Sequence, residues 1–225
     1  MSDASRPAAP PRPAGPRALP EIIYADVRAR IVSGRLEPGQ PVRQDTLAAE
    51  LGVSKIPLRE ALARLEGDGL VVLNPRRGFE VRYLSAEEAE EIFDLRLKVE
   101  PAAAALASRR AGAADREAAR EAWAALDAAV AADAPEAPDL NRAFHLALVR
   151  PAGRALTTAL VERLHNLAER YVRAHLKPEG RPSRARREHE DLFDAWVSGR
   201  PHTVETLVRA HIQHALDDLR VQLKS

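Results

Sequence analysis

Apolar and polar residues alternate with helical spacing along most of this chain. Between residues 21 and 66, three groups of apolar residues recur every three or four positions and predict three helices. The first should end near Gly34 and the second, a short one, near Gly52. The segment LVVLNPRRGFEV at 70–81 instead predicts two short strands joined by a turn. Residues 21–83 are therefore expected to form a small domain of three helices and a β-hairpin.

From residue 85 to residue 222 the periodicity is helical throughout. Glycines and prolines divide this part into six predicted helices, at 85–110, 113–132, 138–149, 153–176, 184–198 and 201–222. The first opens on Ser85-Ala86-Glu87-Glu88, the sequence of a capping box. Residues 1–20, which are rich in Pro, Ala and Arg, have no apolar periodicity and are expected to be a disordered arm. The predicted fold is mainly α, with the small N-terminal domain followed by an all-α six-helix bundle at 85–222.

Composition narrows the classes of function. The chain of 225 residues has no cysteine, which excludes disulfides, thiolate metal sites and cysteine nucleophiles. No apolar run approaches the ~20 residues of a membrane span, and the N-terminus lacks the apolar core of a signal peptide. We therefore expect a cytoplasmic protein without a membrane partner. Because the net charge is only +1, a surface for nucleic acid would have to come from local clustering of cations.

The third predicted helix carries cations opposite its apolar side. Ser54 stands at the N-cap, where its side chain is expected to accept a hydrogen bond from an amide of the first turn. Pro57 is then the third helical residue, where a missing amide hydrogen costs little. The buried stripe should consist of Leu58, Ala61, Leu62 and Leu65. Lys55 and Arg59 face outward, as in a recognition helix that reaches base edges or phosphates.

The predicted hairpin adds Arg76-Arg77-Gly78 at its tip, a cationic wing that could follow a groove of DNA. A pair of helices joined by a turn is also a plain packing motif, in which case these cations are only solvated. The order of helix, short helix, capped third helix and basic hairpin favours binding to DNA.

This part of the sequence resembles the GntR family of bacterial transcription regulators. The resemblance covers about residues 21–83 and is most specific in GRLEPG, LAAELGVS, PLREALARLEGDGLV and RRGFEV. It implies a winged helix-turn-helix domain that binds double-stranded operator DNA. The DNA contacts that it implies fall on Arg43, Gln44, Ser54, Lys55, Arg59, Arg77 and Gly78. Where the family more often has arginine, this chain has Lys55, which cannot form the bidentate contact of a guanidinium.

Three of the bundle helices each place one histidine on the apolar stripe. These are His145, His189 and His211. A single histidine in a core is usually structural, but three in one apolar bundle are costly unless they converge. Three imidazoles with an oxygen donor suit a divalent ion such as zinc or nickel. The other four histidines, His165, His175, His202 and His214, are expected at the surface or the rim.

Arg96 and Glu100 lie four residues apart on the apolar face of the first bundle helix. They could form an internal ion pair that fixes the packing of the helices. Alternatively, an inward guanidinium beside a metal could bind a carboxylate with two hydrogen bonds.

The six-helix part, at about residues 88–216, resembles the FCD domain, the effector-binding half of FadR-type regulators, in its VanR-like six-helix variant. The resemblance implies a metal site at Asn141, His145, His189 and His211, with Asn141 replacing the aspartate of the family, and an inward Arg96. A neutral amide oxygen is a poorer ligand for a cation, so the metal affinity is lower, or water or the effector completes the coordination.

Together the two resemblances imply a homodimeric repressor, not an enzyme, that responds to a small carboxylate effector. Two alternatives remain. A three-histidine ion could activate water in a metal-dependent enzyme, although the sequence shows neither a general base nor a nucleophile motif beside the cluster. The metal could also be purely structural in a bundle without a ligand.

Overall fold

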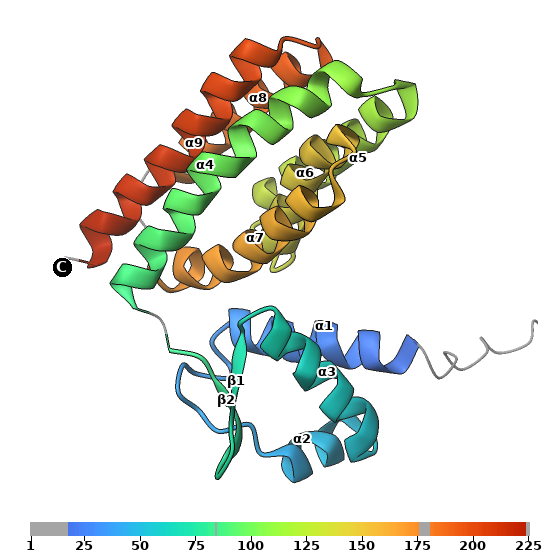
Figure 1. Cartoon of the computed structure of the whole chain (residues 1–225), viewed down its shortest axis with the longest axis vertical. Helices are drawn as coiled ribbons and strands as arrows, with labels where there is room; N and C mark the ends of the chain where they lie inside the picture. The colour runs from blue at the N-terminus through green and yellow to red at the C-terminus, as the bar shows by residue number, and fades with distance from the viewer. Residues whose placement is uncertain (1–17, 84, 176–180, 224–225) are drawn as a thin grey trace, which may run out of the picture.

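The chain folds into a small head domain and a larger helical body, as Figure 1 shows. The computed structural model describes residues 18–83, 85–175 and 181–223. The head consists of α1 (Ala18–Val32), α2 (Gln44–Leu51), α3 (Lys55–Gly67), β1 (Val71–Asn74) and β2 (Gly78–Val81). The predicted three helices and hairpin are thus confirmed. Residues 18–20, which we placed in the arm, belong to α1, and the rest of the expected arm lies outside the described residues.

The core of the head forms around the apolar stripe of α3. Leu58, Ala61, Leu62 and Leu65 are completely buried, as the helical spacing predicted, while Ile56 on the opposite side is 72% exposed. α1 crosses this stripe with Ile23, Val27 and Ile31. The antiparallel hairpin pairs Val71 with Val81 and turns between Asn74 and Gly78. Three apolar residues of the hairpin, Val71, Phe79 and Val81, belong to the same core, which packs the hairpin beside α3.

The body contains the six helices expected from the sequence. They are α4 (Ala86–Arg110), α5 (Ala113–Ala131), α6 (Ala137–Val149), α7 (Ala155–His175), α8 (Arg181–Val197) and α9 (Pro201–Leu223), with a short 3-10 turn, η1 (Arg150–Ala152), after α6. α8 begins three residues earlier than expected. Figure 1 shows α4 and α9 side by side along one face of the body. The interior is filled by leucines, alanines and few aromatic rings, among them Trp196, whose indole donates to the carbonyl of Leu148 at 2.9 Å.

Only half of the predicted capping box forms at the start of α4. The Ser85 hydroxyl accepts from the Glu88 amide at 3.0 Å, as expected. The Ser85 amide, however, donates to the Tyr171 hydroxyl at 3.3 Å and not to the Glu88 carboxylate. That carboxylate is occupied by the Tyr171 hydroxyl at 2.7 Å and by Arg82 at 2.7 Å. Contacts with α7 and with Arg82, in the linker between β2 and α4, therefore replace the local capping interaction.

α4 continues through a proline in its interior. Pro101 has no amide hydrogen to donate to the Leu97 carbonyl one turn earlier, a loss that would normally weaken the helix. Arg209 of α9 donates to that carbonyl instead, at 3.3 Å. The neighbouring helix thus supplies the hydrogen bond that the proline removes.

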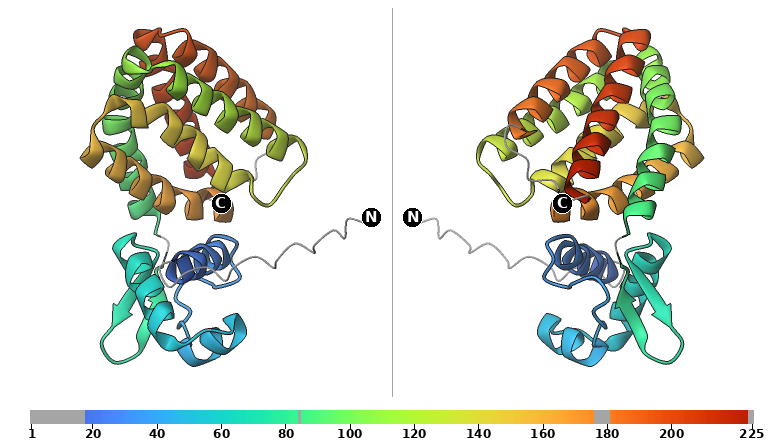
Figure 2. Two further views of the ribbon diagram at one scale, coloured as in Figure 1. Left: turned by 90° about the vertical axis from the view of Figure 1, so that its right-hand side faces the viewer. Right: turned by 90° about the vertical axis from the view of Figure 1, so that its left-hand side faces the viewer.

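The head and the body meet through α1 and α7. Figures 1 and 2 show α1 on the side of the head that faces the body, with α2 and the hairpin tip at the opposite end. Within the described segments, the helices are all too short or too polar to cross a membrane.

Candidate DNA-binding surface and metal pocket

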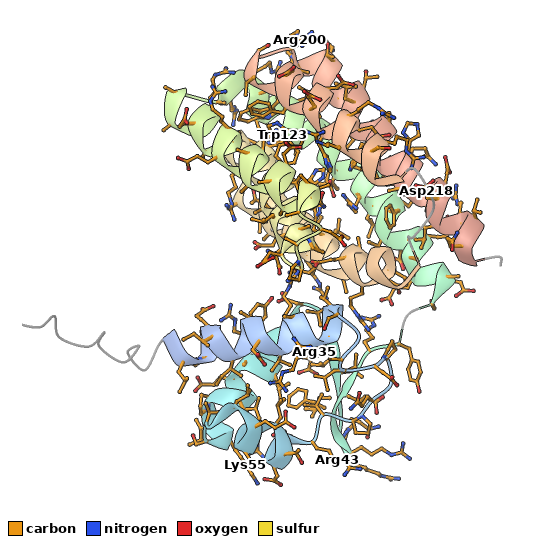
Figure 3. The ribbon with its side chains drawn as sticks, turned by 180° about the vertical axis from the view of Figure 1, so that it is seen from behind. Arg35, Arg43, Lys55, Trp123, Arg200 and Asp218 are labelled. Carbon is orange, nitrogen blue, oxygen red and sulfur yellow. The ribbon has the colours of Figure 1, made fainter. Side chains whose placement is uncertain are left out.

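The residues expected to contact DNA gather at the end of the head that faces away from the body. Figure 3 shows Arg43 and Lys55 at this end and Arg35 on the side of the head nearer the body. Arg43, Ser54, Lys55, Arg59 and Arg77 are exposed, and Gln44 is half-buried. The surface is thus built from the start of α2, the start of α3 and the tip of the hairpin.

Ser54 is the N-cap residue of α3, but its side chain makes no capping hydrogen bond within the described part of the chain. Our expectation of such a bond was wrong. The amide of the third helical residue is a usual donor to an N-cap side chain, and here that residue is Pro57, which has none. The Ser54 hydroxyl is therefore left facing the solvent, beside the N-terminus of a helix.

Gln44 lies between the recognition helix and the wing. Its carbonyl oxygen accepts from the Nε of Arg59 at 3.1 Å. Its amide nitrogen lies 3.6 Å from the point where a side chain on Gly78 would begin. Gly78 also has φ +79°, a conformation that favours glycine. Lys55 is ion-paired with the exposed Asp45, a contact that the sequence did not predict.

We expect Arg59→Ala to weaken binding to a cognate duplex by about 1–3 kcal/mol, because it removes a cation positioned to reach a base edge or a phosphate. The melting temperature should stay the same, since the side chain is exposed. Fluorescence anisotropy with a duplex selected from a random pool by the parent protein measures the effect. Arg35→Ala is the matched control, because it removes the same charge outside this surface. Equal losses for both variants would contradict the assignment of the recognition helix.

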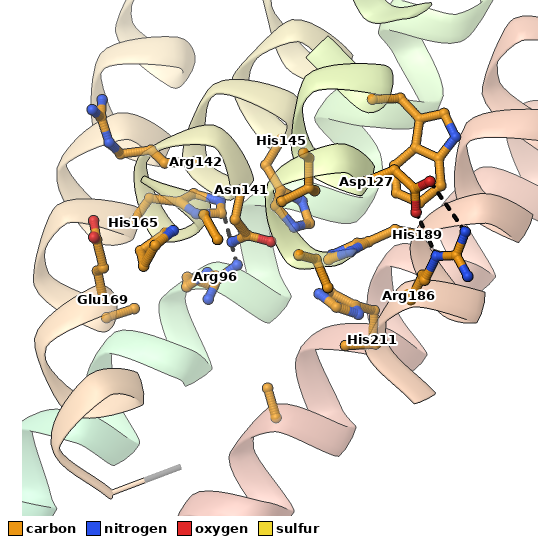
Figure 4. Close-up of a pocket in the computed structure, with 18 of the residues that line it drawn as sticks. Arg96, Asp127, Asn141, Arg142, His145, His165, Glu169, Arg186, His189 and His211 are labelled. Atoms are coloured by element: carbon orange, nitrogen blue, oxygen red, sulfur yellow. Dashed lines mark hydrogen bonds and ion pairs between the residues drawn. The ribbon is translucent and has the colours of Figure 1, made fainter. Parts of the chain in front are cut away.

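The three histidines on the stripes of α6, α8 and α9 converge inside the body. The ring centres of His189 and His211 lie 4.5 Å apart, and that of His145 lies 5.2 Å from each of them. One ring nitrogen from each histidine lies within 4.8 Å of the others. Figure 4 shows the three side chains directed toward a common point.

The donor set fits a divalent cation. His145 Nε2 is buried and has no hydrogen-bond partner among the described residues, an arrangement that is costly unless the nitrogen binds a ligand. Burial and the neighbouring histidines hold the pKa of His145 well below its usual range, so the ring is neutral, as coordination requires. The Nδ1 of His211 lies 2.7 Å from a carboxylate oxygen of Glu188, which orients the ring. Metal-binding histidines commonly have such a partner at the ring nitrogen that does not bind the metal.

Asn141, the fourth expected ligand, lines the same pocket one turn before His145 on α6. Its side chain points into the pocket in Figure 4. An amide oxygen is thus available near the cluster, although it is a weaker donor than a carboxylate.

His165 was expected at the surface, and this expectation was wrong. The residue is 4% exposed, and its ring centre lies 4.9 Å from that of His145. α7 packs against α4 and α6 of the body and against α1 of the head, so it is buried on more sides than its leucines indicate. His202 and His214 are exposed as expected, and the side chain of His175 lies outside the described residues.

Arg96 and Glu100 form a buried ion pair at 2.6 Å, with side chains only 7% and 2% exposed. His165 Nε2 lies 3.1 Å from the Glu100 carboxylate and 3.3 Å from the Arg96 guanidinium. Burial by itself would raise the pKa of Glu100, but Arg96 and His165 lower it to about 2, so Glu100 is charged. Because Arg96 also lines the pocket, the structure is compatible both with an internal ion pair and with the binding of a carboxylate by Arg96.

These groups surround a cavity of about 290 Å³. Its lining includes the histidines, Arg96 and Asn141. Apolar side chains also line it, among them Trp123, Leu126, Val130, Pro138 and Ala168. The cavity can hold a small organic molecule with an anionic end at the histidines and an apolar body.

Two family models match the chain. Residues 19–81 match the family of bacterial regulatory proteins of the gntR family, and residues 91–214 match the FCD domain. The HTH-type transcriptional repressor GlaR of Escherichia coli is 32% identical over 153 residues, which cover 66% of this chain and 70% of that protein. The HTH-type transcriptional regulator BphR of Paraburkholderia xenovorans is 30% identical over 213 residues, 91% of this chain and 86% of the relative.

Among solved structures, E. coli McbR/YncC superposes with a TM-score of 0.76 and 24% identity over 91% of this chain and 98% of that one. At this identity, the likeness concerns the fold alone. The curated relatives are transcriptional regulators and not enzymes.

Proposed function

Because the chain belongs to the GntR family of transcriptional regulators and carries an FCD domain, we propose that it is a homodimeric repressor controlled by a small carboxylate effector. The effector binds in the body beside a divalent metal ion, zinc or nickel. The observation that carries this proposal is the convergence of His145, His189 and His211 in a cavity that Arg96 also lines.

In this proposal His145, His189 and His211 hold the ion, and the Asn141 amide or a water molecule completes the coordination. When bound, the ion would supply a Lewis acid for the anionic end of the effector. Arg96 donates to the effector carboxylate through guanidinium hydrogens that Glu100 does not use. Glu100 and His165 keep that guanidinium oriented, since both lie within hydrogen-bond distance of it.

The DNA-reading surface supports the other half of the proposal. The start of α3 and the wing lie next to each other and present arginines and a lysine to the solvent, as a winged helix does toward the major groove and the flanking backbone. The sign of regulation is taken from GlaR, a relative that is named a repressor.

The proposal is tested with a duplex selected from a random pool and with zinc and a panel of carboxylic acids. We expect the protein to bind the duplex and at least one acid to change the affinity by about 5- to 150-fold when zinc is present. Failure to select any duplex would refute the DNA-binding function. A zinc-loaded protein whose melting temperature no acid changes would favour the structural metal site instead.

We place the dimer interface on the outer face of α4 and α7. Leu156 of α7 is 90% exposed, the most exposed large apolar side chain among the described residues, and Leu160 is 41% exposed. A cavity on the same face is lined by Val99, Leu106 and Thr157, by two alanines, and by the cations Lys98, Arg109 and Arg154. An apolar projection next to a cavity suits a two-fold interface, in which each copy inserts into the other.

Leu156→Glu is therefore expected to weaken dimerisation by about 1.5–3 kcal/mol, on the order of ten- to hundredfold in Kd, because the leucine would no longer be buried by the partner. Analytical ultracentrifugation measures the change. Val221→Glu on α9, where the replaced valine is 66% exposed, is the control and should leave the dimer intact. If Leu156→Glu dimerises like the parent, the interface lies elsewhere.

A further inference from the structure

A charged side chain of the head is buried in the body. Arg28 lies on α1, and only 4% of it is exposed. Its guanidinium donates to the Asp139 and Glu169 carboxylates and, at 3.3 Å, to the Asn166 side-chain oxygen. All three acceptors belong to the body, on α6 and α7. One residue of the DNA-reading domain is thus held by three side chains of the other domain.

One of these acceptors lines the metal pocket, and the other two lie close in sequence to residues that line it. Glu169 itself lines the cavity, and Asn166 directly follows His165 on α7. Asp139 precedes the pocket residue Asn141 by two positions on α6. Asp139 also accepts from Arg142 at 3.2 Å, and Arg142 lines the cavity. One of the two carboxylates that hold Arg28 therefore lines the cavity, and the other pairs with a residue that lines it.

The contact is difficult to break without changing the position of the head. A buried guanidinium loses its hydration, and only well-placed carboxylates compensate for that loss. Burial would lower the pKa of Arg28, but Glu169 and Asp139 raise it, so the charge is retained. If Arg28 left this position, Glu169, which is 8% exposed, would lose the buried cation that it contacts.

The contacts around Arg28 leave little space for the head to slide along α7. Gly69, in the turn after α3, has φ +76°, and a side chain there would begin 3.0 Å from Leu167 of α7. Arg170 of α7 donates to the carbonyl of Arg82, at the start of the linker. The head is thus seated closely on α7, and Arg28 is the side chain that reaches from it to both α6 and α7.

We infer that Arg28 is a positioning residue that fixes the orientation of the DNA-reading head on the wall of the metal pocket. Through it, a change in the pocket reaches the head. This inference rests on the proposed function of the pocket as a ligand site. A ligand that contacts Asn141 or Arg142 shifts α6, Asp139 moves with the same turn, and Arg28 follows its carboxylates. In a dimer, the spacing of the two heads then changes, and with it the fit to two half-sites.

The positioning role is tested by a distance that needs no ligand. Because the chain has no cysteine, spin labels can be placed at Glu60→Cys in the head and Asp194→Cys in the body, both exposed. Labelled protein is diluted with unlabelled protein, so that pulsed dipolar spectroscopy reports the distance within one chain. We expect Arg28→Gln to shift or broaden the distance distribution. Arg30→Gln is the matched control, because Arg30 lies on the same helix and pairs with Asp26 and Glu50 of the head. An unchanged distribution in Arg28→Gln would overturn the inference.

The transmission role is tested with zinc alone as the probe. We expect zinc to change the affinity of the parent for the selected duplex. Arg28→Gln should still bind both zinc and DNA, but its DNA affinity should be nearly the same with and without zinc. Arg30→Gln should keep the full change. The same zinc-dependent change in Arg28→Gln as in the parent would overturn the transmission.

Failure of the proposed function is recognised separately. A parent protein that binds no zinc refutes the proposed metal site, while the distance measurement still decides the role of Arg28. If Arg28→Gln does not fold, Asp139→Asn replaces it in both experiments. The Asp139 side chain is 45% exposed, and the substitution leaves the contact between Arg28 and Glu169 in place.

Discussion

Protein stripped of metal by a chelator is expected to gain thermal stability when zinc or nickel is added back. An ion that binds only the folded state at a thousand times its Kd stabilises that state by about 4 kcal/mol. For a chain of this length, that corresponds to a rise of about 10 °C in melting temperature. The gain should disappear under acid, because only neutral imidazoles coordinate. Differential scanning calorimetry together with metal analysis measures both effects.

Two substitutions test which residues bind the metal. His189→Ala should abolish the effect of metal by removing one of the three convergent rings. Asn141→Asp should strengthen it by supplying a charged oxygen at the pocket wall. His202→Ala is the control, since that histidine is exposed. The metal site is wrong if titration of the parent with both ions yields neither bound metal nor a change in melting temperature.

Leu62→Ala is expected to lower the free energy of unfolding by about 2–5 kcal/mol. Leu62 lies on the side of α3 that faces the core of the head, and it is completely buried. Truncation therefore removes apolar contacts and leaves a cavity. Urea denaturation followed by circular dichroism measures the loss. Ile56→Ala provides the comparison, because Ile56 lies on the same helix but is 72% exposed, and its loss should stay within about 0.5 kcal/mol. Equal losses would mean that α3 is turned the other way.

The fold follows from local patterns that the sequence states clearly. The leucine spacing of α3 identified its buried side because one face of that helix packs and the other meets solvent. The same reasoning brought His145, His189 and His211 together, since each lies on an apolar stripe of a separate helix. Glycines and prolines set the limits of the helices to within a few residues.

The features that escaped prediction depend on packing between distant segments. His165 lies outside the leucine stripe of α7, and a helix covered on several sides gives no single apolar face to recognise. Arg28 has an ordinary charged position on α1, and nothing nearby in the sequence indicates that Asp139 and Glu169, over a hundred residues away, surround it. The missing cap at Ser54 is different, because Pro57 at the third helical position could have revealed it from the sequence.

The hydrogen bond between Gln44 and Arg59 has a consequence for the rate and entropy of binding. A free arginine on a surface samples many rotamers, and ordering such a side chain at an interface costs about 0.5–1.5 kcal/mol. In this head the Nε of Arg59 is already held at 3.1 Å by the side-chain oxygen of Gln44. Much of the ordering therefore takes place when the head folds. If Arg59 contacts DNA as proposed, the duplex would meet a guanidinium that is already oriented, which would favour rapid productive encounters over a slow search among rotamers.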